Sequence, residues 1–209
     1  MLGQGFSFSL SRPPDAAIRG WLDHQSKEDF SYPDVGASLE GAESLRARLD
    51  GRYVIDHYRA RLGFGAAAFE RAHSALRRWE MFNLDWVELC WPTTPIEVGS
   101  TVGVLVTGPV VWWLNPCRIV QCIDETGSTE RFGFAYGTLP DHAAQGEEYF
   151  RVEWSHADDV VWYEVLAFSR PQQILARLGY PYLRFMQKRF SGDSIRAMRR
   201  ATRPFASTE

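Results

Sequence analysis

A change in hydrophobic periodicity near residue 84 constrains the fold more than any other feature of this sequence. From there to about residue 168, apolar and polar side chains largely alternate, and a period of two is typical of β-strands. These segments are also rich in β-branched and aromatic residues, which favour strands. The pattern predicts six strands, at residues 84–91, 101–107, 110–124, 131–139, 147–154 and 160–168.

The connections between these segments are short and rich in turn-forming residues, for instance at residues 92–95 and 124–128. Short turns join antiparallel strands, whereas a parallel pair needs a crossover of about a dozen residues or more. The sequence therefore predicts an antiparallel meander within an α+β fold.

Further elements flank the meander on both sides. Residues 53–62 predict another strand, and residues 66–82 have the three-and-four apolar spacing of an amphipathic helix. Pro171 suits the first turn of a last helix, with Ser169 near its cap. This helix should be kinked by Gly179 and Pro181 and run to about Arg200. These ingredients predict a helix-grip fold, in which a curved antiparallel sheet of about six to seven strands wraps around a long C-terminal helix.

The first 50 residues predict a helical and turn extension, and residues 51–209 the helix-grip domain, with both packed as one unit. A chain of 209 residues with 45% hydrophobic residues suffices for one sizeable core. Aromatic residues make up 14% of the chain, and they either fill that core or line a cavity.

Several classes of protein are disfavoured by the sequence. Residues 1–10 lack a secretory signal pattern, and the apolar stretch 102–114 is too short to span a bilayer, so we expect a cytoplasmic protein without stable membrane insertion. The three cysteines and five histidines lack ligand-type spacing, which predicts no metal site. The glycines at 63 and 65 lack the rest of a dinucleotide fingerprint, so no cofactor is predicted.

Charge is unevenly distributed along the chain. The segment from Arg170 to the C-terminus carries a formal charge of +7, which leaves −10 for the rest of a chain whose net charge is −3. No aromatic platform or glycine-rich phosphate cradle accompanies the basic residues. A solvated helix face is therefore a better interpretation than a nucleic-acid partner.

Two motifs carry a resemblance to a known family. They are Phe-Ser-Tyr-Pro-Asp-Val-Gly-Ala at residues 30–37 and Arg-Phe-Gly-Phe-Ala-Tyr-Gly-Thr-Leu-Pro-Asp-His at residues 131–142, and shorter segments follow at 146–148, 162–164, 167–171 and 187–190. In this order they resemble the bacterial and plant family named domain of unknown function 1990. The resemblance runs from about residue 30 to residue 200, although residues 189–195 depart from the family's more aromatic and basic pattern.

The resemblance implies membership of the polyketide-cyclase and lipid-transfer-like superfamily, also called START or Bet v 1-like. Its members bind or transform apolar molecules in the cavity of a helix-grip fold. The expected function is therefore the binding of a hydrophobic or amphiphilic small molecule in an internal cavity. The alternative is a cofactor-independent enzyme, such as a cyclase, dehydratase or isomerase, that uses the same cavity.

Glu164 is the first candidate for chemistry, because it lies in the middle of an apolar predicted strand. A buried carboxylate either pairs with a cation, here Arg118 or Arg170, or keeps its proton through a raised pKa. We favour pairing, which is an architectural role. The full set of catalytic candidates is Glu164, Tyr136, His142 and Arg118.

Aromatic side chains on the predicted strands and the last helix are the candidate ligand contacts, namely Trp112, Phe134, Tyr136, Trp162, Tyr182 and Phe185. Glu147 and Glu148 are expected on opposite faces of a strand, at a solvated hairpin edge, and do not suggest a catalytic pair.

Overall fold

The computed structural model describes residues 8–108 and 111–204. Its centre is an antiparallel sheet in the order β2-β8-β7-β6-β5-β4-β3, and the two-residue strand β1 pairs with β5. The strands are β1 (Phe8–Ser9), β2 (Val54–Phe64), β3 (Val87–Cys90), β4 (Thr101–Thr107), β5 (Trp112–Glu125), β6 (Thr129–Thr138), β7 (Ala144–Ser155) and β8 (Val160–Pro171).

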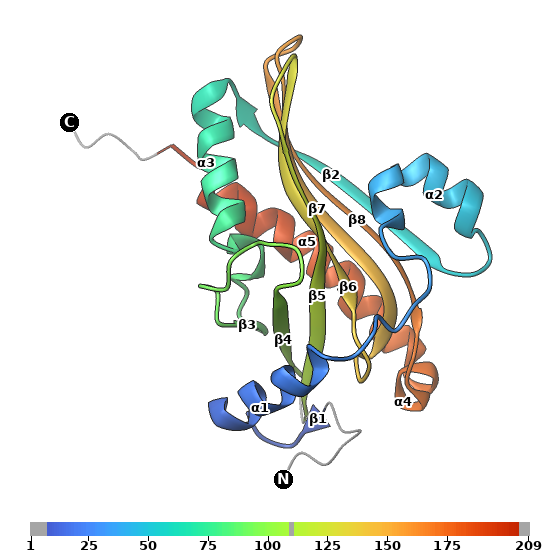
Figure 1. Ribbon diagram of the computed structural model, residues 1–209. Coiled ribbons are helices and arrows are strands. Elements are labelled where there is room, and N and C mark those ends of the chain that lie inside the picture. The colour runs from blue at the N-terminus through green and yellow to red at the C-terminus, as the bar shows by residue number, and fades with distance from the viewer. Residues whose placement is uncertain (1–7, 109–110, 205–209) are drawn as a thin grey trace.

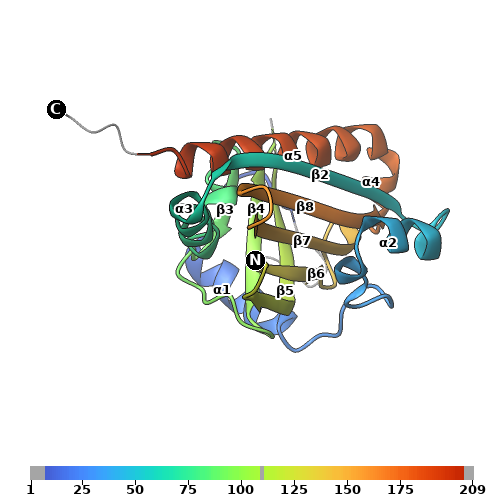
Figure 2. The ribbon, with the colours of Figure 1, turned by 90° about the horizontal axis from the view of Figure 1, so that it is seen from above.

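The sheet curls around the C-terminal helix. In Figure 1, α5 passes behind the strands, and Figure 2 shows it lying along β2 with the other strands curving away beneath it. The helices are α1 (Asp15–Gln25), α2 (Ala42–Leu49), α3 (Ala66–Arg77), α4 (Ile174–Leu178) and α5 (Tyr180–Ala201), with short 3-10 helices η1 (Ala37–Glu40) and η2 (Glu80–Phe82). The predicted helix-grip arrangement is confirmed.

Strand alternation divides the core between the two faces of the sheet. On the concave face, Phe134 and Phe150 pack with Trp79 in the largest cluster of buried residues. On the convex face, Ala135 and Phe168 pack with residues of a second cluster that comes mainly from the N-terminal segment. Consecutive residues of one strand therefore belong to different environments.

The N-terminal segment covers parts of the sheet. Helix α1 buries Ile18 and Leu22 against Leu105 and Leu114 of β4 and β5. Residues 30–49 lie on the convex face. No helix in the described part of the chain is both long and apolar enough to cross a membrane.

Several predicted boundaries differ from the structure. The last helix does not start at Pro171, because β8 extends to that residue and pairs it with Ala144 of β7. A proline is tolerated there because it ends the strand. Strand β3 is shorter than predicted, and the helix after β2 ends at Arg77, since Trp79 takes a left-handed conformation with φ of 59°. The predicted start of a strand at residue 110 lies outside the described residues.

Candidate functional site

A pocket of about 260 Å³ lies between the concave face of the sheet and helices α4 and α5. Its surface is mostly apolar, and Tyr182 of α5, which is 43% exposed, is part of its lining on the solvent side. The sheet and the helices both contribute to its walls. The aromatic side chains that line it are Phe82, Trp86, Trp113, Tyr136, Tyr182 and Phe190.

A carboxyl–phenol pair forms the main polar feature of the pocket. Glu148 of β7 lies opposite Tyr136 of β6 in the strand register, and Tyr136 Oη donates a hydrogen bond to Glu148 Oε2 over 2.7 Å. Burial raises the pKa of Glu148 to about 7, an effect that the hydrogen bond from Tyr136 opposes and nearby Asp56 reinforces. Both protonation states of Glu148 are therefore populated at neutral pH.

Tyr136 remains a neutral donor under the same conditions. Its side chain is buried, and burial together with the neighbouring Glu148 carboxylate holds its pKa well above the usual range. The phenol therefore keeps its proton while the carboxyl group gains or loses one.

His142 lines the pocket in a loop between β6 and β7. Its Nδ1 atom accepts a hydrogen bond from the backbone N–H of Ala144 over 2.9 Å, which places the proton of the neutral ring on Nε2. Burial lowers the pKa of His142 to about 4, so the ring is uncharged near neutrality. The preceding Asp141 has φ of 70°, and its side chain and carbonyl accept hydrogen bonds from Gln25 and Gln173.

An ion pair ties α5 to the edge of the sheet beside the pocket. Arg184 of α5 donates to both carboxylate oxygens of Asp56 on β2, each over 2.7 Å, and also to Gln187 Oε1 over 2.6 Å. The side chains of Asp56 and Arg184 are each only 15% exposed. This bidentate geometry neutralises the charge of Asp56 where it borders the pocket.

Residues 31–197 match the family described as domain of unknown function (DUF1990). The chain belongs to this family. A UPF0548 protein of Dictyostelium discoideum is 36% identical over 206 residues, covering 93% of this chain and 95% of that protein. A UPF0548 protein of Deinococcus radiodurans is 34% identical over 205 residues, covering 93% of this chain and 98% of that protein. Human STARD10 is similar in structure, with a TM-score of 0.43 and 12% identity over 96% of this chain and 83% of that chain.

Three of the residues predicted from sequence line the pocket of this DUF1990 protein, namely Tyr136, His142 and Tyr182. The structure brings Tyr136 into contact with Glu148, whereas His142 lies in the loop that follows β6. Phe185 of α5 is 59% exposed and is not a lining residue among those described.

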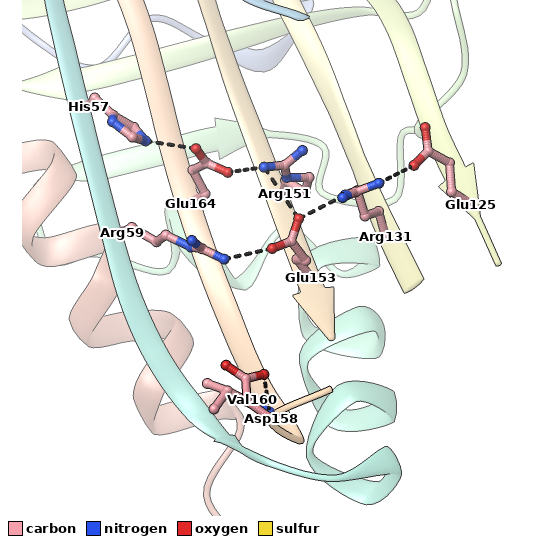
Figure 3. A network of polar contacts seen from close by, with 9 residues as sticks. All are labelled: His57, Arg59, Glu125, Arg131, Arg151, Glu153, Asp158, Val160 and Glu164. Carbon is pink, nitrogen blue, oxygen red and sulfur yellow. Dashed lines mark hydrogen bonds and ion pairs between the residues drawn. The ribbon is translucent and has the colours of Figure 1, made fainter. Parts of the chain in front are cut away.

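Glu164 lies on the convex face, away from the pocket, in a network of charged side chains (Figure 3). Its carboxylate contacts His57 Nε2 at 2.7 Å and pairs with Arg151, and the network continues through Glu153 and Arg131 to Glu125. The expected ion pairing of Glu164 is therefore present.

The partners expected for Glu164 were wrong. Arg118 donates to the carbonyl oxygen of Glu28 and lies over the ring of Phe30 at 4.8 Å, and Arg170 donates to Gln145 Oε1 over 2.8 Å. Arg151 takes their place because the β7–β8 register sets it directly opposite Glu164.

Three predicted aromatic ligand contacts also lie elsewhere. Trp112 packs with the α1 cluster, and its neighbour Trp113 lines the pocket instead. Phe134 is fully buried in the concave core, and Trp162 lies on the convex face beneath Arg59, whose guanidinium is 4.5 Å from the ring centroid. These three side chains thus lie in three different regions of the DUF1990 fold.

Sequence reasoning missed the importance of Glu147 and Glu148. Their predicted positions on opposite faces are confirmed, but the predicted solvated hairpin edge is wrong because β7 begins at Ala144 and Glu147 is only 2% exposed. The alternation from Phe150 back along β7 is the signal that places Glu148 on the concave face.

Proposed function

We propose that this protein binds an apolar or amphiphilic small molecule in the pocket between the concave face of the sheet and helices α4 and α5. The observation that carries this proposal is a mostly apolar pocket with one carboxyl–phenol pair, Glu148 and Tyr136. Ligand sites typically combine apolar walls with a few polar groups that orient the ligand. Tyr136 and Tyr182 are the proposed contacts that were also expected from the sequence.

The volume of the pocket limits the ligand. At about 260 Å³ it lies close to the lower end of the range for small-molecule sites, which is roughly 300–1,000 Å³. Such a volume favours a single short chain or a small ring system over a two-chain lipid. Its polar group would meet Glu148 while its apolar part contacts aromatic and aliphatic walls.

Filling the pocket from the sheet side is expected to abolish binding. Ala167 lines the pocket and pairs with Glu148 across β7 and β8, so Ala167→Leu places extra methyl groups next to the polar pair. We expect an affinity loss of about tenfold or more for any ligand that raises the melting temperature of the wild type. Binding is measured by thermal shift and calorimetry with fatty acids, fatty alcohols, fatty amines, isoprenoids and aromatic polyketides.

The matched control is Ala67→Leu, which adds the same side chain at an exposed position of α3. This variant should bind like the wild type. If Ala167→Leu also binds like the wild type, the ligand does not occupy this pocket. If no compound shifts the melting temperature and mass spectrometry finds no copurifying molecule, the binding proposal fails.

A cofactor-independent enzyme is the second candidate, and Glu148 is the observation that favours it. A carboxyl group with a pKa of about 7 is suited to general acid–base catalysis, and Tyr136 is a neutral donor beside it. His142 faces the same pocket as a neutral imidazole. Cyclases, dehydratases and isomerases of this kind move a proton at carbon next to a carbonyl group.

Proton transfer can be tested before a substrate is known. Carbonyl compounds that bind are incubated with the protein in deuterated water, and mass spectrometry follows deuterium uptake. If the protein is an enzyme of this kind, the wild type should accelerate the exchange. The Glu148→Gln variant should lose this acceleration. The Glu164→Gln variant, which is changed on the convex face, should retain it. If every carbonyl compound that binds takes up deuterium no faster than in buffer alone, the enzyme proposal fails and only the binding function is supported.

A further inference from the structure

The charged residues that line the pocket are all acidic. None of the lining residues, all of which belong to the described part of the chain, is lysine or arginine. The acidic side chains at its wall are Asp56 and Glu148, while the carboxylate of Glu147 is bound on the convex side by Tyr32 and Ser38. A negatively charged ligand would therefore enter a site that offers no cation to pair with it.

Of the two acidic side chains at the pocket wall, Glu148 is the one without a cationic partner among the described residues. Asp56 is held by Arg184 in a bidentate ion pair, whereas the one hydrogen bond of the Glu148 carboxylate among the described residues comes from Tyr136 to Oε2. The other oxygen, Oε1, makes no hydrogen bond within the same residues, and the Glu148 side chain is half-buried rather than fully enclosed. It is therefore available to a ligand.

The other groups described near Glu148 do not supply an unpaired positive charge. Tyr136 of β6, Tyr163 of β8 and Cys117 of β5 lie close enough for the carboxylate to raise their pKa values, and all three stay neutral at physiological pH. On β2, Asp56 is paired with Arg184 of α5. In the loop after β6, His142 is neutral, with its Nε2 carrying the proton.

The remaining walls suit an organic cation. Aromatic rings attract cations through the negative face of their π-systems, and the attraction strengthens where water is excluded. Among the lining rings, Trp113, Phe82 and Phe190 come from three different elements around the pocket. A protonated nitrogen would thus find rings on several sides and one carboxylate.

We propose that the pocket selects an amphiphilic amine, a molecule with an apolar body and one protonated nitrogen that forms a charge-assisted hydrogen bond with Oε1 of Glu148. This inference rests on the proposed binding function and narrows it to one chemical class of ligand. An alcohol of the same shape makes a neutral hydrogen bond at this point, and a carboxylate meets repulsion.

The amine must bind the ionised form of Glu148, so its affinity depends on pH. With a pKa of about 7, the ionised fraction of Glu148 rises from roughly one tenth to nine tenths between about pH 6 and pH 8. An alkylamine keeps its proton over that interval, as lysine does with a pKa of about 10.4. The affinity is therefore expected to rise about tenfold over this interval and to fall again only where the ligand loses its proton.

The experiment compares n-octylamine, 1-octanol and octanoate by calorimetry and thermal shift on the full chain. We expect octylamine to bind about tenfold or more tighter than either analogue near pH 8, and only octylamine to bind more tightly as the pH rises. Glu148→Gln, which preserves shape and the contact with Tyr136, should remove both the preference and the pH dependence. Glu164→Gln changes a glutamate on the opposite face and should retain both.

The outcomes separate this inference from the function on which it rests. If octanol or octanoate binds as tightly as octylamine, or if Glu148→Gln keeps the preference, the amine inference fails while small-molecule binding stands. If none of the three binds, but another compound binds the wild type and loses affinity in Ala167→Leu, only the amine inference fails. If no compound of any class binds, both proposals fail. The pH profile of the wild type provides a second readout that does not depend on any variant folding.

Discussion

Replacing Glu147 by alanine is expected to lower the free energy of unfolding by about 3–5 kcal/mol. Its carboxylate is 2% exposed and accepts hydrogen bonds from Tyr32 Oη over 2.7 Å, the backbone N–H of Gly36 over 2.7 Å, the backbone N–H of Ser38 over 3.0 Å, and Ser38 Oγ. Alanine would leave these donors without their partner, and buried unsatisfied donors are costly.

The effect should be measured by urea unfolding, with Glu70→Ala as the matched control. Glu70 lies exposed on α3, so its replacement should change the free energy of unfolding by about 0.5 kcal/mol or less. Tyr32→Phe removes one of the four donors and should have an intermediate effect of about 1–2 kcal/mol. Equal stabilities for Glu147→Ala and Glu70→Ala would show that the carboxylate does not hold residues 30–38 against the sheet.

Glu147 also explains how the N-terminal segment and the pocket are connected. Since consecutive strand residues point to opposite faces, fixing Glu147 on the convex side fixes Glu148 on the concave side. The close approach of the N-terminal segment depends on small residues in β6, because a Cβ atom at Gly137 would lie 2.1 Å from Tyr32 Oη.

The antiparallel meander from β3 to β8 and the closing helix were predictable because they follow from local patterns. A window of about ten residues is enough to recognise period-two alternation, a short turn or a helical segment. The pairing of β2 with β8 was not predicted, because it joins segments that lie far apart in the sequence. The partner of Glu164 was not predictable, since it depends on which residue of β7 lies opposite it. That register is a property of two strands together, and no local pattern encodes it.

The predicted ligand contact Trp112 on β5 illustrates a second limit of prediction from the sequence. The pairing of β5 with β6 shifts between Ile119 and Gln121, so the two halves of the strand follow different alternations. Cys122 after the shift and Trp113 before it both face the concave side. Counting by twos across the irregularity selects Trp112, which in fact packs with the α1 cluster. The bulge leaves no unambiguous mark in the sequence.

Replacing Gly146 by alanine is expected to destabilise the protein by roughly 2–4 kcal/mol, because strain and collision act together. Gly146 has φ of 147°, a conformation that residues with a side chain rarely adopt. A Cβ atom there would lie 1.9 Å from the carbonyl oxygen of Phe168, which belongs to the paired strand β8 and cannot move without breaking the ladder. The N–H of Gly146 also donates to Thr138 Oγ1 over 3.0 Å.

The position of Gly146 next to Glu147 and Glu148 makes its replacement informative about the pocket as well as about stability. A shift of β7 at this point should displace Glu148 from Tyr136, so any ligand that depends on the pair should bind more weakly even in the folded fraction of Gly146→Ala. Gly20→Ala is the control, because a Cβ atom at Gly20 meets nothing within 4 Å and alanine favours the helix α1 by about 1 kcal/mol. In urea unfolding, Gly146→Ala should therefore have a lower free energy of unfolding than the wild type. Gly20→Ala should have an equal or higher one. If Gly146→Ala were as stable as the wild type, β7 and β8 would be able to move apart at this point at little cost in free energy. The close contact at Gly146 would then not fix the position of Glu148.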